Sequence, residues 1–239
     1  MSDKDHLQFS LILPCYNERD NIEMLFDEIN LAQKQVNFEV IIVENGSTDD
    51  TISIINKHKH KIENLNLIYV LKNIGIGHAI KKGIKEANTD IICYSHADLQ
   101  IKIENCIIAL KIYKEDHNIN TFVKGKRVSR SFIDFIFTSA MSLFNSIMFF
   151  TFLEDIHAQP NMFKKSEVLN IEQIPDNMGI DLFLYLYFKN KKYKIKRFNV
   201  NFLKRRYGFG SNDNFKQKLA YIPKAIKSSI QILSMKKFK

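Results

Sequence analysis

The sequence of 239 residues predicts one α/β domain with a Rossmann-like, mostly parallel central sheet flanked by helices. Strand-like and helix-like patterns alternate through the first half of the chain. The run at 38–43 is dominated by apolar residues, as expected for a central parallel strand covered on both faces. Helices of about 12 residues between short strands form βαβ units. Ligands bind such sheets at the carboxyl ends of the strands, so we expect the functional residues in the loops there.

The expected elements of the first half follow a regular order. Strands are expected at 9–14, 38–43, 67–71 and 90–94, and helices at 21–33 and 75–87. The first helix has one apolar face, formed by Ile22, Leu25, Phe26 and Ile29. The turn at 44–50 leads into another helix, whose N-cap we expect to be Ser47, Thr48 or Asp49. The loops at strand ends are then 15–19, 44–50, 72–78 and 95–100.

The second half contains two long apolar or amphipathic segments. The run at 131–153 is not expected to span a membrane, because polar residues recur along it at helical spacing, at Asp134, Thr138, Ser142 and Asn145. Two interpretations stay open: a helix lying in a membrane interface, or a helix covering the protein's own core. The segment 215–239 predicts a second amphipathic helix, basic on one side and apolar on the other. We therefore expect a domain at 1–212, with halves at about 8–130 and 131–212, and a basic C-terminal helix at 213–239.

Charge is distributed unevenly along the chain. Residues 189–239 contain sixteen Lys or Arg and one acid, a net charge of +15, which leaves −6 for the first 188 residues. This imbalance predicts an anionic partner for the basic part, such as phospholipid head groups, a lipid phosphate or nucleic acid; a solvated basic face is the alternative. No recognised nucleic-acid module is present, so no nucleic-acid partner is expected.

The cysteines and the first residues indicate a cytoplasmic protein. Cys15, Cys93 and Cys106 form no CxxC pair and no metal-binding spacing, so buried thiols in a reducing compartment are expected. The start of the chain, 1–8, is polar and lacks the apolar core of a signal peptide, so secretion is not expected.

Four short blocks, in order and each at an expected strand end, resemble the family 2 glycosyltransferases of the GT-A fold. They are LPCYNE at 13–18, VENGSTD at 43–49, KNIGIGHA at 72–79 and HADLQ at 96–100. The branches most similar are the dolichol-phosphate mannosyltransferases and the bacterial polyprenyl-phosphate glycosyltransferases. The resemblance covers about 8–130 strongly and about 150–212 more weakly. It implies a nucleotide-diphosphate-sugar donor, either a UDP-sugar or a GDP-sugar.

The resemblance implies a set of donor-binding residues at these strand ends. They are Pro14, Tyr16, Asn17, Glu18, Glu44, Asp49, Gly75, Gly77, Asp98 and Arg127. Carboxylates and amides suit ribose hydroxyls and base edges, the glycines would allow close approach of the backbone, and a guanidinium can bind a diphosphate through two hydrogen bonds. Glu44 stands where the family usually has Asp, and Asp49 has the alternative role of a helix N-cap.

The HADLQ block is the expected metal site. Alternate residues at a strand end point the same way, so positions 96, 98 and 100 can converge. We expect Asp98 and Gln100 to bind Mn²⁺ or Mg²⁺, with His96 as a further candidate ligand. The family pattern has an acid where this chain has His96, and an imidazole suits Mn²⁺ better than Mg²⁺. His96 could alternatively only pack or bond a phosphate.

Three acids and a basic segment complete the expected site. Asp98, Asp155 and Asp181 are the catalytic candidates, with surface ion pairs as the alternative for the last two. An alcohol acceptor needs a general base, whereas a lipid phosphate is already an anionic nucleophile. The acceptor or phosphate ligands expected from the resemblance are Arg130, Gln159, Arg205, Arg206 and Ser211.

These observations predict an inverting transferase that moves a sugar to a polyprenyl phosphate, bound peripherally at the cytoplasmic face of the membrane. Lys and Arg near anionic lipid contribute about 1 kcal/mol each, so a peripheral membrane surface is an expected partner. A saccharide acceptor of a cell-surface glycan is the alternative. A nucleotidyltransferase is disfavoured, because the loop after the first strand, at 15–20, contains no glycine.

Overall fold

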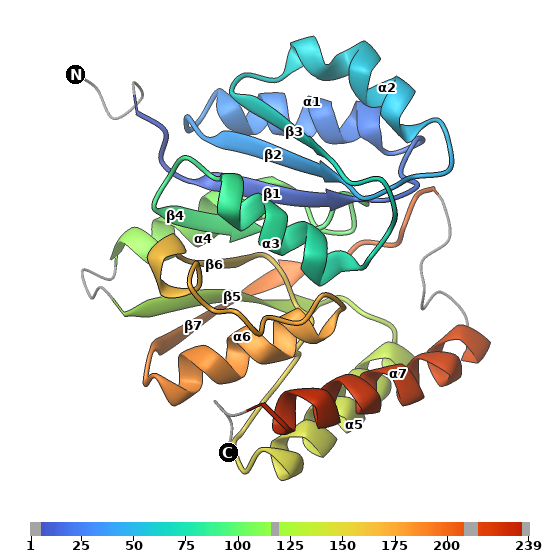
Figure 1. Cartoon of the computed structure of the whole chain (residues 1–239), viewed down its shortest axis with the longest axis vertical. Coiled ribbons are helices and arrows are strands. Elements are labelled where there is room, and N and C mark those ends of the chain that lie inside the picture. The colour runs from blue at the N-terminus through green and yellow to red at the C-terminus, as the bar shows by residue number, and fades with distance from the viewer. Residues whose placement is uncertain (1–5, 116–119, 208–214, 236–239) are drawn as a thin grey trace.

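A seven-stranded sheet forms the centre of the molecule in the computed structural model, which describes residues 6–115, 120–207 and 215–235 (Figure 1). The strands are β1 Ser10–Cys15, β2 Glu39–Glu44, β3 Leu65–Tyr69, β4 Ile91–Tyr94, β5 Thr121–Val128, β6 Asn161–Lys164 and β7 Lys194–Asn201. The α-helices are α1 Ile22–Gln33, α2 Thr51–His58, α3 Ile76–Glu86, α4 Glu104–Glu115, α5 Phe132–Met148, α6 Gly179–Asn190 and α7 Phe215–Leu233. Two single 3₁₀ turns, at Lys59–Lys61 and Lys165–Glu167, complete the list.

The strand order is β3-β2-β1-β4-β6-β5-β7, and the sheet is mostly parallel, as predicted. Only β6 runs against its neighbours, between β4 and β5. The chain moves outward from β1 through β2 to β3, then returns to place β4 on the other side of β1. This reversal between β1 and β4 is the switch point at which open α/β sheets bind ligands. The loops after β1 and β4 therefore flank the expected site.

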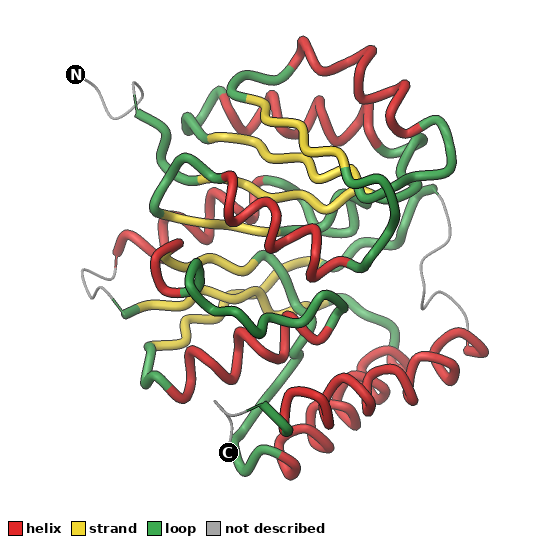
Figure 2. The backbone as a smooth tube through the Cα atoms, viewed as in Figure 1, coloured by secondary structure: helices red, strands yellow, loops and turns green. Residues whose placement is uncertain are grey.

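Helices cover both faces of the sheet (Figure 2). One apolar core lies between the sheet and α1, α2 and α4, and the other between the sheet and α3 and α6. Along β2, Val40 and Ile42 belong to the first core, and Ile41 and Val43 to the second. Burial on both faces explains why the sequence of β2 has no polar–apolar alternation.

The expected strands and helices of the first half are all present, with shifted ends. The N-cap of α2 is Asp50, so the prediction of Ser47, Thr48 or Asp49 was wrong by at least one position. Asp49 nevertheless serves the start of this helix, because its carboxylate accepts hydrogen bonds from the Thr51 amide at 3.0 Å and from the Thr51 hydroxyl. Cys15, Cys93 and Cys106 are free and buried, as predicted.

The predicted long helix at 131–153 is shorter, and it does not cover the core. Ser131 caps α5 by accepting from the amide of Asp134, and the helix ends at Met148. The buried residues of α5 are Ser142 and Asn145, so its polar stripe faces inward. Six of its large apolar side chains are exposed, which contradicts the core-covering interpretation. No helix in the described part of the chain is long and apolar enough to cross a membrane.

Helices α5 and α7 lie side by side and run in the same direction (Figure 1). Asp134 pairs with Lys218, the ring of Phe137 packs against Tyr221, and Asn145 accepts from the Ser229 hydroxyl at 2.7 Å. The residue numbers of each pair differ by 84. A constant difference means that the helices are parallel and in register along most of α5.

Candidate active site

The loops after β1 and β2 are tied together by Asn17. The backbone amide of Asn17 donates to the Ser47 hydroxyl at 3.0 Å, and its side-chain oxygen accepts from the backbone amide of Thr48 at 2.8 Å. Asn17 adopts a φ of 55°, a left-handed conformation that asparagine tolerates better than most residues. Asn17 therefore holds the shape of both predicted donor loops.

Glu44, predicted to bind the donor, turns back on its own loop. Its carboxylate accepts hydrogen bonds from the amides of Ser47 at 2.6 Å and Gly46 at 3.3 Å, and the residue is buried. These bonds satisfy backbone donors of the turn. The observed role of Glu44 is to fix the loop after β2.

Gly75 and Gly77 have a packing role that the sequence did not reveal. A Cβ at Gly75 would lie 2.5 Å from the carbonyl oxygen of Asp176, and one at Gly77 would lie 2.2 Å from that of Pro175. Gly75 also has a φ of 141°, which side chains rarely adopt. Both glycines are needed because the start of α3 packs tightly against the loop before α6.

Asp98 lies at the switch point and is bridged to Glu18 by Arg205. One Asp98 oxygen accepts from the Gln100 amide at 3.0 Å, and the other pairs with Arg205 at 2.5 Å. The same guanidinium reaches Glu18 at 3.2 Å. Burial raises the pKa of Glu18 above its usual value, although the Asn21 amide and Arg205 counteract part of this effect. The segment after β7 thus brings a cation between the ends of β1 and β4.

Several buried polar atoms at these strand ends have no hydrogen-bond partner. Seven such side-chain atoms occur among the described residues, and four belong to Asn45, Ser95, Gln159 and Arg205. A buried polar atom without a partner costs about 1–3 kcal/mol, so such atoms are rare unless a water or ligand satisfies them. Their gathering near the carboxyl ends of the strands is expected of a site that binds a polar ligand.

The HADLQ block offers a partial set of metal ligands. No group of three or more His, Cys, Asp or Glu side chains that could hold a metal ion occurs in the described ranges. The Gln100 side chain donates to the Leu203 carbonyl at 3.3 Å. Burial lowers the pKa of His96, which keeps its ring neutral and able to bind a metal. Mg²⁺ sites for nucleotides often use one or two protein carboxylates plus phosphate oxygens, and Asp98 offers one such carboxylate.

Asp155 is surrounded by two arginines. It accepts from the Arg127 amide at 2.7 Å and from the Arg127 side chain at 2.9 Å, and it pairs with Arg130 at 3.2 Å. Burial alone would raise the pKa of Asp155, but Arg127 and Arg130 outweigh burial and hold this pKa below its usual value. The surface ion-pair alternative is wrong for Asp155, because the residue is 7% exposed.

Asp181 is also buried, and it is part of a network. It accepts from the Tyr94 hydroxyl at 2.7 Å and lies 3.1 Å from Nδ1 of His157. Burial would raise the pKa of Asp181, but the bond to His157, the nearby charge of Lys124 and the bond to Tyr94 lower it overall. The surface ion-pair alternative is therefore wrong for Asp181 as well.

Sequence reasoning missed the partners of these acids. Lys124 is fully buried in β5, where it donates to the Ala158 carbonyl at 2.8 Å and to the Asn161 side chain at 3.0 Å. The burial lowers the pKa of Lys124 to about 7. A lysine inside an apolar strand pattern was the available signal for Lys124. His157 stands two positions after Asp155, but its position in the sequence does not identify Asp181 as its partner.

Other predicted residues lie apart from this network or outside the described part. Arg206 is exposed and contacts the sulfur of Met24 on α1 at 3.6 Å. Gln159 is buried, with its oxygen unpartnered, and Tyr16 is 40% exposed. Pro14 is part of β1. Ser211 lies outside the described residues.

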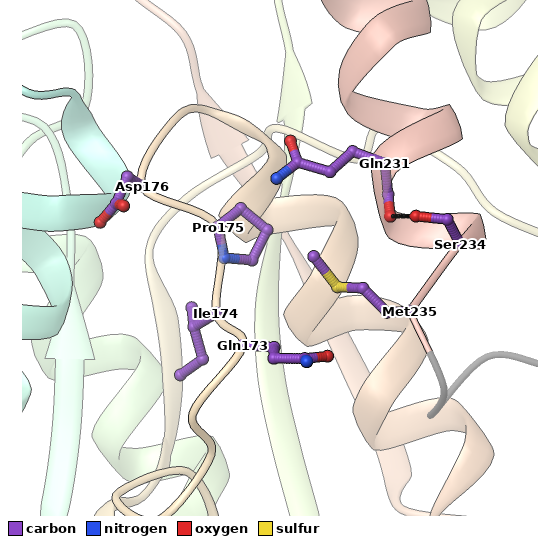
Figure 3. Close-up of a pocket in the computed structure, with 7 residues that line it drawn as sticks. All are labelled: Gln173, Ile174, Pro175, Asp176, Gln231, Ser234 and Met235. Carbon is purple, nitrogen blue, oxygen red and sulfur yellow. Dashed lines mark hydrogen bonds between the residues drawn. The ribbon is translucent and has the colours of Figure 1, made fainter.

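A hollow on another part of the surface contains none of the predicted donor residues. It lies between the loop before α6 and the end of α7, and it is lined by Gln173, Ile174, Pro175, Asp176, Gln231, Ser234 and Met235 (Figure 3). Its wall at α7 is fixed by the Ser234 hydroxyl, which donates to the Gln231 carbonyl at 2.7 Å.

Solved structures share this fold. Glucosyl-3-phosphoglycerate synthase from Mycobacterium tuberculosis, in complex with Mn²⁺, UDP and glucosyl-3-phosphoglycerate, superposes with a TM-score of 0.72. The match covers 97% of this chain and 81% of that one, at 16% identity. The complex of the same enzyme with UDP alone gives a TM-score of 0.75, covers 98% of this chain and 82% of that one, and has 17% identity. At such identities the likeness establishes the fold alone, and it agrees with the predicted GT-A fold.

Curated relatives share the first half of the sequence. Dolichol-phosphate mannosyltransferase of Pyrococcus furiosus is 32% identical over 125 residues, which are 51% of this chain and 35% of that protein. Poly-beta-1,6-N-acetyl-D-glucosamine synthase of Staphylococcus aureus is 31% identical over 121 residues, 50% of this chain and 28% of that one. The chain thus spans about a third of the length of the curated relatives it matches. The model of glycosyl transferase family 2 matches residues 10–164, which include β1 to β6, so the chain belongs to that family.

Proposed function

We propose that this chain transfers a sugar, with inversion, from a nucleoside-diphosphate sugar to a polyprenyl phosphate at the cytoplasmic face of a membrane. The observation that carries the acceptor assignment is the outward apolar face of α5. Its large side chains are 51% to 76% exposed, at Phe132, Ile133, Phe135, Ile136, Leu143 and Ile147. A soluble surface rarely presents so many neighbouring large apolar groups unless a partner covers them.

The charge of α7 supports an anionic lipid surface as the partner. Lys216, Lys224 and Lys227 are exposed on this helix, which has no acid in its described residues. Helices with an apolar face beside lysines typically lie in the plane of a membrane interface. The pairing of α5 with α7 puts the apolar face and the lysines on one two-helix unit, and Arg130 contacts this unit through the Thr138 hydroxyl of α5.

The donor would occupy the loops at the switch point. We assign the diphosphate to Arg205 and Arg127, which now pair with Asp98 and Asp155 and would exchange these carboxylates for phosphate oxygens. Asp98, with His96 as a second ligand and Gln100 nearby, would hold Mn²⁺ or Mg²⁺. The cation, when bound, would stabilise the negative charge of the departing nucleoside diphosphate. Asp155 would then keep Arg130 in place for the acceptor.

A saccharide hydroxyl is the second candidate acceptor. This reaction needs a general base, and Asp181 with the imidazole of His157 offers one. The similarity to a polysaccharide synthase is compatible with this alternative. The two acceptors differ in whether the base is needed, so they can be separated experimentally.

The test is to incubate the purified chain with UDP-sugars and GDP-sugars, with and without polyprenyl phosphate, and with Mn²⁺ or EDTA. We expect release of nucleoside diphosphate that requires both the lipid phosphate and the metal. Asp98→Ala should abolish release without changing the far-ultraviolet circular dichroism. Asp27→Ala, which removes an exposed acid of α1, is the matched control and should keep full activity.

Three results would contradict parts of this proposal. Release that is insensitive to EDTA would contradict the metal role of Asp98. Release that requires a saccharide instead of the lipid phosphate would establish the second acceptor. Release from no nucleotide sugar in the panel would contradict the donor assignment.

A further inference from the structure

His157 is held from two sides by residues of different helices. Its Nδ1 lies 3.1 Å from a carboxylate oxygen of Asp181 on α6, and its Nε2 lies 3.1 Å from the hydroxyl of Tyr221 on α7. The His157 side chain is 34% exposed, whereas that of Asp181 is 6% exposed. The carboxylate therefore orients the ring from inside the protein, and the Nε2 side of the ring faces Tyr221 of α7.

The inner partner of His157 is an ionised carboxylate. Asp181 accepts from the Tyr94 hydroxyl of β4, and the charge of Lys124 on β5 acts on it from the sheet. These contacts and His157 itself lower the pKa of Asp181 despite its burial. An ionised Asp181 accepts a hydrogen from Nδ1 and fixes the orientation of the ring.

The network adjoins the predicted donor site. His96 lies among the charges of Asp98, Asp181, Arg127 and Arg205, all of which act on its protonation. Asp98 and Asp181 are therefore both close enough to act on the same residue. His157 is also two positions from Asp155, the partner of Arg127. A group bound at Nε2 of His157 would lie between the donor residues and the α5–α7 pair.

We propose that Nε2 of His157 binds the acceptor phosphate, and that the Tyr221 hydroxyl occupies this position until the acceptor enters. This inference rests on the proposed function and names the acceptor-binding residue. In the complex, Nδ1–H donates to Asp181 and Nε2–H donates to a phosphate oxygen, so the ring is an imidazolium. The buried carboxylate balances its charge, and no proton is transferred to or from the acceptor.

Tyr221 connects this binding site to the exposed helices. Its ring packs against Phe137 of α5 at a centroid distance of 6.5 Å, and the residue is buried. The α5–α7 pair thus places a hydroxyl directly on the acceptor-facing nitrogen. A phosphate head group that arrives along these helices would place one of its oxygens at Nε2 in place of the Tyr221 hydroxyl. The phosphate oxygen is the more strongly charged partner.

The experiment measures binding and turnover separately. Binding of a short-chain polyprenyl phosphate in detergent micelles is followed by calorimetry without donor, for the wild type, His157→Gln and Asp181→Asn. We expect both substitutions to weaken binding by about tenfold or more, because each weakens or removes a charge-assisted hydrogen bond whose loss changes affinity by about that factor. Tyr221→Phe, which removes the competing hydroxyl, should bind more tightly. His58→Gln is the matched control, because His58 at the end of α2 also lies beside a carboxylate, that of Glu23. This variant should bind like the wild type.

Kinetics give the second readout. His157→Gln should raise the KM for the lipid phosphate and leave the KM for the nucleotide sugar unchanged. At saturating lipid phosphate, His157→Gln should keep a kcat close to that of the wild type, because the ring transfers no proton to or from the acceptor.

The possible failures are distinguishable. A wild type that binds no polyprenyl phosphate would overturn the proposed acceptor and this site with it. A wild type that binds it equally well after His157→Gln would overturn the His157 site alone. A collapse of kcat in His157→Gln, with no change in the KM for the lipid phosphate, would identify His157 as a base for a hydroxyl acceptor instead.

Discussion

Lys124 shows what burial does to a single charged residue in this protein. Its ammonium group has two oxygen partners, the Ala158 carbonyl and the Asn161 side chain, and no carboxylate bonded to it among the described residues. Burial is the main cause that lowers its pKa from 10.5 to about 7, and nearby Arg197 adds to it. The folded protein therefore releases the proton of Lys124 at a pH where the unfolded chain keeps it.

This difference predicts a pH-dependent stability. Between pH 7 and about 10 the unfolded chain binds one more proton than the folded one, so the free energy of unfolding should rise with pH. The contribution of Lys124 is at most about 1.4 kcal/mol per pH unit. Urea unfolding of the wild type and of Lys124→Met at pH 7.5, 8.5 and 9.5 measures it as the difference between the two proteins. Parallel pH profiles for the two proteins would show that Lys124 keeps an ordinary pKa.

The acids of the site change stability in the same direction, but over an acidic range of pH. The pKa values of Asp155 and Asp181 are lowered, so their contribution to stability is complete at neutral pH and is lost as the pH falls below their usual range. Sequence reasoning selected both acids, and it selected Arg127 and Arg130 without pairing them with Asp155. It did not select His157 and Tyr94, which lie 24 and 87 positions from Asp181, because only the fold brings them together.

At the scale of elements, the regular part of the fold was predictable and the packing of loops was not. Strand and helix patterns located β1 to β4 and α1 to α3, because burial on one or both faces imposes a period on the sequence. The sequence pattern could not show that α5 turns its polar residues inward. The reason is that α7, which contacts these polar residues, lies far along the chain. For the same reason, the glycines of α3 gave no sign that they pack against the loop before α6.

Gly77 yields a prediction with an unusual sign. Replacing a helical glycine by alanine normally stabilises a helix by about 1 kcal/mol. At Gly77 the added Cβ would lie 2.2 Å from a backbone oxygen of the loop before α6, so either α3 or this loop must move. We expect Gly77→Ala to lower the free energy of unfolding, measured with urea. Lys82→Ala, on the exposed side of the same helix, is the control and should change it little. A more stable Gly77→Ala protein would contradict the close contact.

At the scale of the whole molecule, the acidic and basic parts of the chain have different positions. The basic residues of the last fifty positions extend from β7 to α7, and α7 lies at one end of the molecule beside α5 (Figure 1). The sequence predicted an anionic partner from charge alone. The structure adds the apolar face of α5, which charge counts do not reveal.

This arrangement predicts binding to anionic vesicles. Leu143→Glu and Ile147→Glu on α5 should each reduce cosedimentation with phosphatidylcholine–phosphatidylglycerol vesicles about tenfold or more, because burying such a side chain contributes about 1.5–3 kcal/mol. Leu31→Glu, at an equally exposed leucine of α1, is the control and should bind like the wild type. Higher salt should weaken binding by screening the lysines of α7.

Two outcomes would contradict this surface. Equal binding by all variants would show that the face of α5 does not touch the lipid. A wild type that forms dimers in light scattering, and that Leu143→Glu converts to monomers, would show that a second copy covers the face.

The parallel direction of α5 and α7 has an electrostatic consequence. Helix macrodipoles that point the same way add together, so the amino-terminal ends of both helices contribute positive potential at the same end of the pair. Asp134, the one acid in the first turn of α5, lies there and bonds both Ser131 and Lys218. Burial would raise the pKa of Asp134, but these partners lower it overall. Asp134 thus offsets the combined dipoles, which accounts for an anion on a helix that is otherwise uncharged.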